Sequence, residues 1–239
     1  MRPTNGLVIL LGKYEHCNIK CGKFKGTNMT EFLDRVEYTG DIFSQLDNII
    51  EFIKKHLNFG SKIEGLQRTD RYEIPLVAIR EAVVNALVHR DYHNFGRDIK
   101  VGIYDDILNI VSPGSLPMSN TEKNILDGRS EIRNKVIARV FKELKYIERW
   151  GSGIKRMMDS CQEYGLKILE IKETGDSVTV NFLIENDSIN RQKVEDIIDV
   201  RNTRGRMIIN ALRDRNIISM RGSGPKTYYI LNEGINNQD

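Results

Sequence analysis

Residues 76–92 are apolar at most positions, and three of their polar side chains recur at a regular spacing. The stretch follows Pro75 and is rich in alanine, leucine and valine, so it predicts a helix. A helix that is apolar on nearly all sides is normally buried. Glu81, Asn85 and His89 recur every four residues and therefore share one face. Because burying such groups unbound is costly, this stripe indicates a polar ligand cavity, a buried polar network or a narrow solvated edge.

The composition excludes few classes of protein. With 239 residues, 40% of them hydrophobic, the chain can form one large domain or two small ones. A net charge of +3 gives no global argument for nucleic-acid binding. The three cysteines are odd in number and lack Cys-x-x-Cys spacing, which indicates reduced thiols. No stretch reaches the length of a membrane helix, so we expect a cytoplasmic protein without membrane contact.

The remaining patterns are typical of an α/β chain. Alternating apolar residues predict strands at 18–25, 32–38, 99–104, 107–111, 168–173, 177–184, 217–220 and 226–231. Apolar residues at helical spacing predict helices at 42–57 with Asp41 as the N-cap, and at 136–144, 154–164, 189–200 and from 203 onward. The polar residues 62–73 predict a loop. A linker expected near residues 185–188 divides the chain into domains at 1–185 and 186–239.

Gly151-Ser152-Gly153 stands directly before a predicted helix. Small residues let backbone N–H groups approach an anion, and a helix N-terminus favours negative charge, so the segment could hold a phosphate. A tight turn is the alternative, because the motif alone is a weak signal. The polar stripe upstream contains a carboxylate, which can deprotonate water, and an amide, whose oxygen can bind Mg²⁺.

The order of these motifs resembles a known family. Residues 81–89, E-A-V-V-N-A-L-V-H, resemble the N-box of the GHKL, or Bergerat-fold, ATPases. The further series H-R-D-Y, S-P-G-S-L-P, R-N-K and W-G-S-G-I-K-R-M is similar to the GHKL-like domain of bacterial transcriptional regulators that are labelled RecG-related. The resemblance extends over residues 3–184 and implies a two-layer α/β sandwich with a mixed sheet. Family members usually carry an upstream Schlafen-type AlbA domain, so we expect these residues to be a piece of a longer protein. No Walker-type loop or helicase motif is found, which argues against a helicase.

The resemblance also implies roles for individual residues. Glu81 would activate water and Asn85 would hold Mg²⁺, while residues 115–149 would form a lid over ATP. The candidate nucleotide site comprises Glu81, Asn85, His89, Ser112, Gly114, Gly151, Ser152 and Gly153. We expect the stripe to face a cavity that also contains the backbone of residues 151–153. GHKL ATPases bind adenine with an aspartate in a D-x-G-x-G box, whereas this chain has Ser112-Pro113-Gly114 there, so the resemblance does not imply the choice of base.

The C-terminal part carries a concentration of positive charge. Residues 201–226 contain seven cations and one acid, a local balance of +6. Two helices followed by a basic hairpin are typical of a winged helix-turn-helix, although a first helix is hard to find. The second predicted helix would place Met207, Ile208, Ala211 and Leu212 inward. The candidate DNA contacts are Arg201, Arg204, Arg206, Asn210, Arg213, Arg221 and Lys226. A solvated basic face or a protein-binding winged helix remains an alternative.

These observations favour a DNA-binding transcriptional regulator with a GHKL-like domain that responds to nucleotide. We expect it to bind ATP, Mg²⁺ and double-stranded DNA, and to form a homodimer. Two alternatives remain open. One is an active Mg²⁺-dependent ATPase, and the other is a nucleotide-free scaffold for dimerisation.

Overall fold

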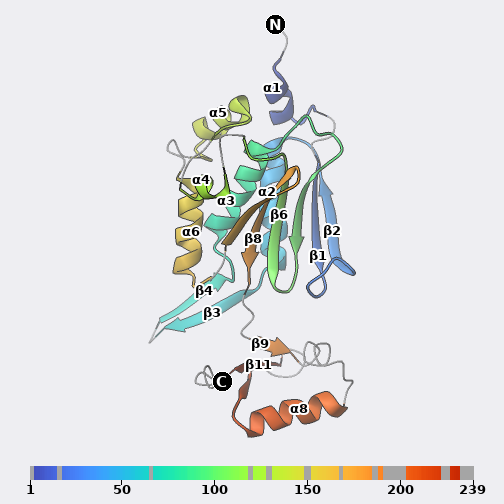
Figure 1. Cartoon of the computed structure of the whole chain (residues 1–239), viewed down its shortest axis with the longest axis vertical. Helices are drawn as coiled ribbons and strands as arrows, with labels where there is room; N and C mark the ends of the chain where they lie inside the picture. Colours follow the sequence, from blue (N-terminus) through green and yellow to red (C-terminus); the bar gives the residue numbers. More distant parts are fainter. Residues whose placement is uncertain are drawn as a thin grey trace. The chain divides into compact units, whose positions relative to one another are not determined.

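The computed structural model describes residues 3–14, 18–64, 67–117, 121–127, 131–147, 152–166, 169–184, 188–190, 203–221 and 227–231 (Figure 1). The chain divides into two compact units, Met1–Ile184 and Glu185–Asp239.

A six-stranded mixed sheet forms one layer of the first unit. Its strands are β1 (Ile19–Phe24), β2 (Phe32–Tyr38), β5 (Ile99–Ile103), β6 (Ile107–Pro113), β7 (Leu169–Thr174) and β8 (Ser177–Leu183). Their order is β2-β1-β5-β6-β8-β7, in which β1 and β5 run parallel and the other neighbours antiparallel. Val101, Ile110 and Val180 are in register across the centre and are buried, whereas Lys100 points to the opposite, exposed face.

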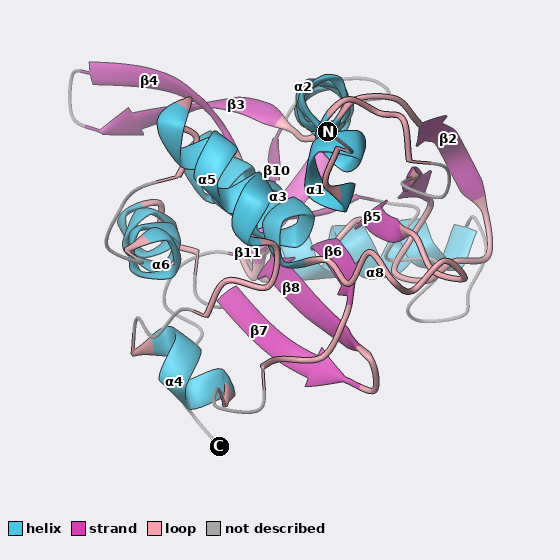
Figure 2. Ribbon diagram, turned by 90° about the horizontal axis from the view of Figure 1, so that it is seen from above, coloured by secondary structure: helices cyan, strands magenta, loops and turns pink. Residues whose placement is uncertain are grey.

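Helices form the second layer and cover one face of this sheet (Figure 2). They are α1 (Asn5–Leu10), α2 (Ile42–His56), α3 (Leu76–His89), α4 (Glu122–Leu126), α5 (Lys135–Glu143) and α6 (Gly153–Glu163). Asp41 caps α2 as predicted, since its carboxylate accepts hydrogen bonds from the Phe43 and Ser44 amides at 3.1 and 2.9 Å. The predicted α/β sandwich is confirmed.

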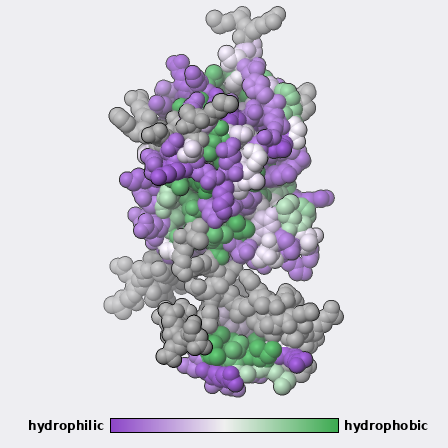
Figure 3. Space-filling view, in the orientation of Figure 1, coloured by the Kyte–Doolittle hydropathy of each residue, from purple (hydrophilic) through white to green (hydrophobic). Residues whose placement is uncertain are grey.

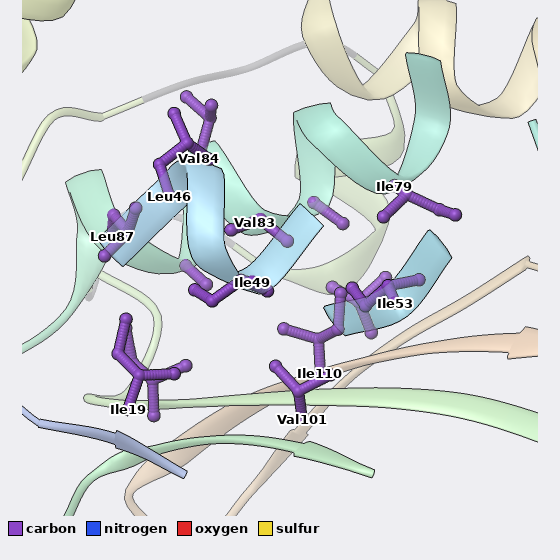
Figure 4. Packing of buried hydrophobic residues seen from close by; sticks show 14 of the residues in the cluster. Ile19, Leu46, Ile49, Ile53, Ile79, Val83, Val84, Leu87, Val101 and Ile110 are labelled. Carbon is purple, nitrogen blue, oxygen red and sulfur yellow. The ribbon is translucent and has the colours of Figure 1, made fainter. Parts of the chain in front are cut away.

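The core lies between the two layers. Ile49 and Ile53 of α2 pack with Val83 of α3 over Val101 and Ile110 of the sheet (Figure 4). All five side chains are at most 2% exposed. Because α3 contacts α2, α6 and strand β6, its apolar residues are buried on several sides, which explains why its sequence is apolar nearly all round.

The loop predicted at residues 62–73 is wrong. Strands β3 (Phe59–Glu64) and β4 (Gln67–Tyr72) pair antiparallel in a separate two-stranded sheet. The two strands are joined to each other by main-chain hydrogen bonds and are not part of the main sheet. Apolar alternation arises where one face of a strand packs on a core, so the sequence of this hairpin lacks it. The predicted end of β6 is also too early, since the strand continues to Pro113 and Gly114 then adopts a φ of +117°.

The second unit contains helix α8 (Thr203–Asp214) and a three-stranded sheet. The sheet has the order β10-β11-β9, with β10 at Ile218–Arg221, β11 at Tyr228–Leu231 and β9 at Ser188–Asn190. The helix predicted at 189–200 is therefore wrong at its start, where β9 pairs with β11. Residues 191–200 lie outside the described part of the chain.

The inner face predicted for α8 is wrong at two positions. Met207 is 65% exposed and Ala211 is also exposed, whereas Ile209 is only 2% exposed and packs with Leu212. Gly205 is buried as well, so the inner face follows an i, i+4, i+7 stripe that is rotated away from Met207. Figure 3 shows hydrophobic atoms at the surface of the second unit in the region of α8.

Two expectations from composition can be compared with the described residues. Cys21 and Cys161 are buried free thiols, and burial raises the pKa of Cys21 to about 12 and that of Cys161 to about 11. Both therefore remain protonated at neutral pH. Within the described residues, no helix has the length and apolar character needed to cross a membrane.

Candidate functional site

The first unit contains a cavity of about 790 Å³ whose walls come from α3, the end of β6, α5 and the start of α6. This volume is within the usual range for small-molecule sites. Among its lining residues are the predicted Glu81, Asn85, His89, Ser112, Gly114, Ser152 and Gly153. The structure thus brings together three segments that are far apart in the sequence. Gly151 lies outside the described residues.

The polar stripe of α3 forms one wall of this cavity. Glu81 is 5% exposed, while Asn85 and His89 are half-buried. The Glu81 carboxylate pairs with the Arg156 guanidinium, with 2.9 Å between Oε2 and Nη2. Of the three interpretations left open by the sequence, the stripe therefore lines a cavity, and its carboxylate is bound by a cation from α6.

The start of α6 lies directly against the Glu81 side chain of α3. A Cβ atom at Gly153 would overlap Oε1 of Glu81. Ser152 is the N-cap of α6, but its side chain makes no capping hydrogen bond, and the first turn of the helix contains no acid. The Glu81 carboxylate of α3 is thus the anionic group placed against this helix terminus, where negative charge is favoured.

The end of β6 is held to α3 by hydrogen bonds. Ser112 is 7% exposed, and its hydroxyl donates to the Ala86 carbonyl at 2.8 Å. A Cβ at Gly114 would overlap the Arg133 guanidinium, which donates to the Ser115 carbonyl. Ser112 is therefore committed as a donor inside the wall, and only its acceptor lone pairs remain for a ligand.

Asn134 joins α5 to the end of α3. Its side-chain amide donates to the carbonyls of Val88 at 2.9 Å and Arg90 at 2.7 Å, which lie at the C-terminal end of α3. No local pattern in the sequence indicated a role for Asn134. Nη1 of the neighbouring Arg133 lies 3.9 Å from Oδ2 of Asp91. These contacts fix the cavity wall formed by α5 relative to the stripe on α3.

A row of cations on α5 also lines the cavity and was missed in the sequence. Lys135, Arg139 and Lys142 follow at intervals of four and three residues, so they share one helical face. Glu131 and Glu143 lie in the same lining. The periodic spacing was the available signal, but only the tertiary structure shows that this face points into the cavity. An anionic ligand would be attracted to this wall.

The His89 imidazole gives the site a pH-dependent component. Burial lowers its pKa below the ordinary value of 6.5, and the nearby positive charge of Arg133 lowers the pKa further. The folded protein therefore takes up this proton less readily than the unfolded chain. Its contribution to the free energy of unfolding is complete above pH 6.5 and is lost as the pH falls through the folded pKa.

We expect His89→Gln to remove part of the loss of stability between about pH 8 and about pH 5, because each unit of pKa difference is worth about 1.4 kcal/mol. Urea unfolding at both pH values measures this. His93→Gln is the matched control, since the His93 side chain is 90% exposed. A loss of stability in His89→Gln equal to that of the wild type would contradict this role of His89.

The cavity offers few ligands for a metal ion. The described residues contain no group of three or more His, Cys, Asp or Glu side chains that could hold one. Asn85 contributes one amide oxygen to the lining, which suits Mg²⁺ when phosphates and waters complete its shell. The Asn85 oxygen therefore suits a metal ion that enters together with a phosphorylated ligand.

The candidate DNA contacts lie in the second unit. Four of them are exposed on α8, namely Arg204, Arg206, Asn210 and Arg213. Arg215, directly after α8, is also exposed. Arg221 belongs to β10. Arg201 and Lys226 lie outside the described residues.

Comparisons with known proteins bear on the first unit. A family model described as "Putative ATP-dependent DNA helicase recG C-terminal" matches residues 96–182. This match supports an ATPase-like domain related to RecG. It begins after α3, so the stripe of Glu81, Asn85 and His89 lies outside the matched residues. A comparison with curated proteins finds no match.

A solved structure shares the fold. The crystal structure of the DIP2311 protein from Corynebacterium diphtheriae superposes with a TM-score of 0.70 at 21% sequence identity. The similarity covers 96% of this chain and 54% of the solved chain. This chain therefore spans about half the length of that protein.

Proposed function

We propose that the first unit binds a nucleoside triphosphate together with Mg²⁺ in the cavity between α3, α5 and α6. The observation that carries the proposal is the meeting of the α3 stripe with the start of α6 around one cavity. Helix N-termini with small residues are common phosphate sites. The match of residues 96–182 to an ATPase-like domain supports the same ligand class.

Each wall of the cavity has a separate task in this proposal. The Asn85 amide oxygen binds Mg²⁺, and the cations of α5 face the phosphate chain. Ser112, with its proton donated to Ala86, accepts a hydrogen bond from the ligand. Magnesium, when bound, neutralises charge on the phosphates.

Hydrolysis of the bound triphosphate is a second proposed function. Glu81 lines the cavity beside Gly153, so its carboxylate can orient and deprotonate a water near a phosphate bound at the start of α6. A nucleotide-free scaffold for dimerisation is the alternative, and it would bind no triphosphate.

Asn85→Ala is expected to remove the Mg²⁺-dependent part of nucleotide affinity, because it deletes the amide oxygen offered to the ion. Calorimetric titration with ATP, GTP and a non-hydrolysable analogue, with and without Mg²⁺, measures this difference. Asn48→Ala is the matched control, since Asn48 is exposed on α2. No binding of any of these nucleotides to the wild type would refute the proposal, and an unchanged Mg²⁺ dependence in Asn85→Ala would refute the role of Asn85.

For the second unit we propose binding to double-stranded DNA, which would make the chain a nucleotide-responsive transcriptional regulator. The supporting observation is the set of arginines exposed on α8, next to a hairpin of β10 and β11. A winged helix uses such a helix to contact the major groove and the hairpin to contact phosphates. Homodimer formation is part of this proposal, since regulators of this kind bind paired half-sites.

A further inference from the structure

The Glu81 carboxylate, which lines the cavity, is paired with Arg156 of α6. Arg156 lies on α6 three residues after Gly153, and its side chain is 35% exposed, compared with 6% for that of Glu81. No local pattern in the sequence indicated a role for Arg156. The ion pair links Glu81, the candidate base, to α6, which begins at the candidate phosphate site. Displacement of either side chain therefore breaks its contact with the other.

The two oxygens of the Glu81 carboxylate have different surroundings. Oε2 accepts from Arg156 at 2.9 Å, and Oε1 lies against Gly153, where a Cβ would overlap it. A phosphate approaching the first turn of α6 would meet this carboxylate at the same place. Two anions cannot share the place without strong repulsion, because the site is largely screened from water.

We propose that the Glu81–Arg156 pair is a latch that a triphosphate opens. This inference rests on the proposed nucleotide site. The terminal phosphate displaces the Glu81 carboxylate from the start of α6, and Arg156 transfers its hydrogen bonds from the carboxylate to the phosphate. A guanidinium binds either anion with similar geometry, and the partial exposure of Arg156 leaves its side chain room to turn.

The latch would make Glu81 available only when a phosphate chain of sufficient length is bound. In the closed pair, Oε2 of the carboxylate is held by the Arg156 guanidinium. Once Arg156 has moved to the phosphate, the carboxylate is free to accept a proton. Arg156 is thus a positioning residue that couples the length of the bound phosphate chain to the release of Glu81.

The test compares ATP, adenosine and inorganic tripolyphosphate on the full chain by calorimetry. Glu81→Gln removes the competing charge and leaves an amide that still accepts from Arg156, so the fold should persist. We expect its affinity for ATP and tripolyphosphate to rise by roughly tenfold, within the usual range of coupling between linked sites, while its affinity for adenosine is unchanged.

A second variant separates phosphate binding from a structural role of Arg156. In the Glu81→Gln background, Arg156→Gln leaves no unpaired buried carboxylate. If Arg156 had only a structural role, this replacement would therefore leave the affinity for ligands unchanged. We expect this double variant to lose the gain of roughly tenfold for ATP and tripolyphosphate. Lys155→Gln in the same background is the control, because Lys155 is exposed on α6.

The outcomes distinguish the latch from the proposed function. If wild type and Glu81→Gln bind ATP and tripolyphosphate equally well, or if the double variant keeps the gain, the latch is wrong and the nucleotide site stands. If tripolyphosphate shows the expected pattern but no nucleotide binds, the latch stands as an anion site and the nucleotide proposal fails. Absence of binding by either ligand to any variant would overturn both.

Discussion

Glu81→Gln is expected to lower the rate of ATP hydrolysis by about 10²–10⁴-fold while the protein still binds nucleotide. The amide cannot take a proton from water, but it is nearly the same size as the carboxylate and fits against Gly153. Release of inorganic phosphate under single-turnover conditions measures the chemical step. The latch also predicts tighter nucleotide binding by this variant. We therefore expect its turnover to fall while its affinity for ATP rises.

Glu163→Gln provides the matched control for this rate measurement. Glu163 is exposed at the end of α6 and is not among the described residues that line the cavity. Its loss should leave turnover close to that of the wild type. Equal turnover by wild type and Glu81→Gln would rule out Glu81 as the base, and the first unit would then bind nucleotide without using this carboxylate for hydrolysis.

Binding of duplex DNA by the second unit is expected to weaken by about 10²-fold between about 50 and about 200 mM salt, if each of Arg204, Arg213, Arg221 and Lys226 neutralises one phosphate. The reason is that counterions released from DNA make affinity depend on salt. Fluorescence anisotropy across a salt series measures the slope. Replacing either Arg221 or Lys226 by Ala should weaken binding to all duplexes alike and lower the slope by about 1.

Two variants on α8 test whether the helix distinguishes sequences. Loss of Arg206 or Asn210 should cost about 1–3 kcal/mol on a preferred site and little elsewhere if the side chain pairs with a base edge. A variant in which the arginines at 204, 206, 213 and 215 are all replaced by Gln serves as the reference for lost charge. Wild-type binding no tighter than this reference would mean that the second unit contacts protein and not DNA.

The part of the site that could be predicted from sequence is the part defined by local geometry. Glu81, Asn85 and His89 share a face because four residues make slightly more than one helical turn, whatever surrounds the helix. Their polarity on a buried helix then predicted a cavity. Gly153 could be placed near a helix start for the same local reason.

The rest of the site depends on tertiary contacts that local patterns do not encode. Arg156 pairs with Glu81 across 75 positions of sequence, and Asn134 binds carbonyls at the end of α3 from 44 and 46 positions away. No periodicity connects such residues. Individually, an arginine on a helix and an asparagine before one are ordinary surface features, and their partners become known only when the fold is known.

Errors in the predicted fold have related causes. The β3–β4 hairpin was missed because its strands pair with each other outside the main sheet, so no core imposes apolar alternation. The inner face of α8 was misplaced because Met207 and Ala211 continue an apolar stripe that the structure leaves exposed. Hydrophobicity indicates which residues can be buried, but neighbouring elements decide which of them are.

Hydrogen exchange of the full chain, measured with and without ATP and Mg²⁺, tests the central claim that the cavity of the first unit is the nucleotide site. The account predicts slower exchange at the start of α6 and at residues 112–117, which lie at the cavity, and no change in β1 and β2. Nucleotide binding that leaves both cavity segments unchanged, or that slows exchange only within residues 203–221, would contradict it.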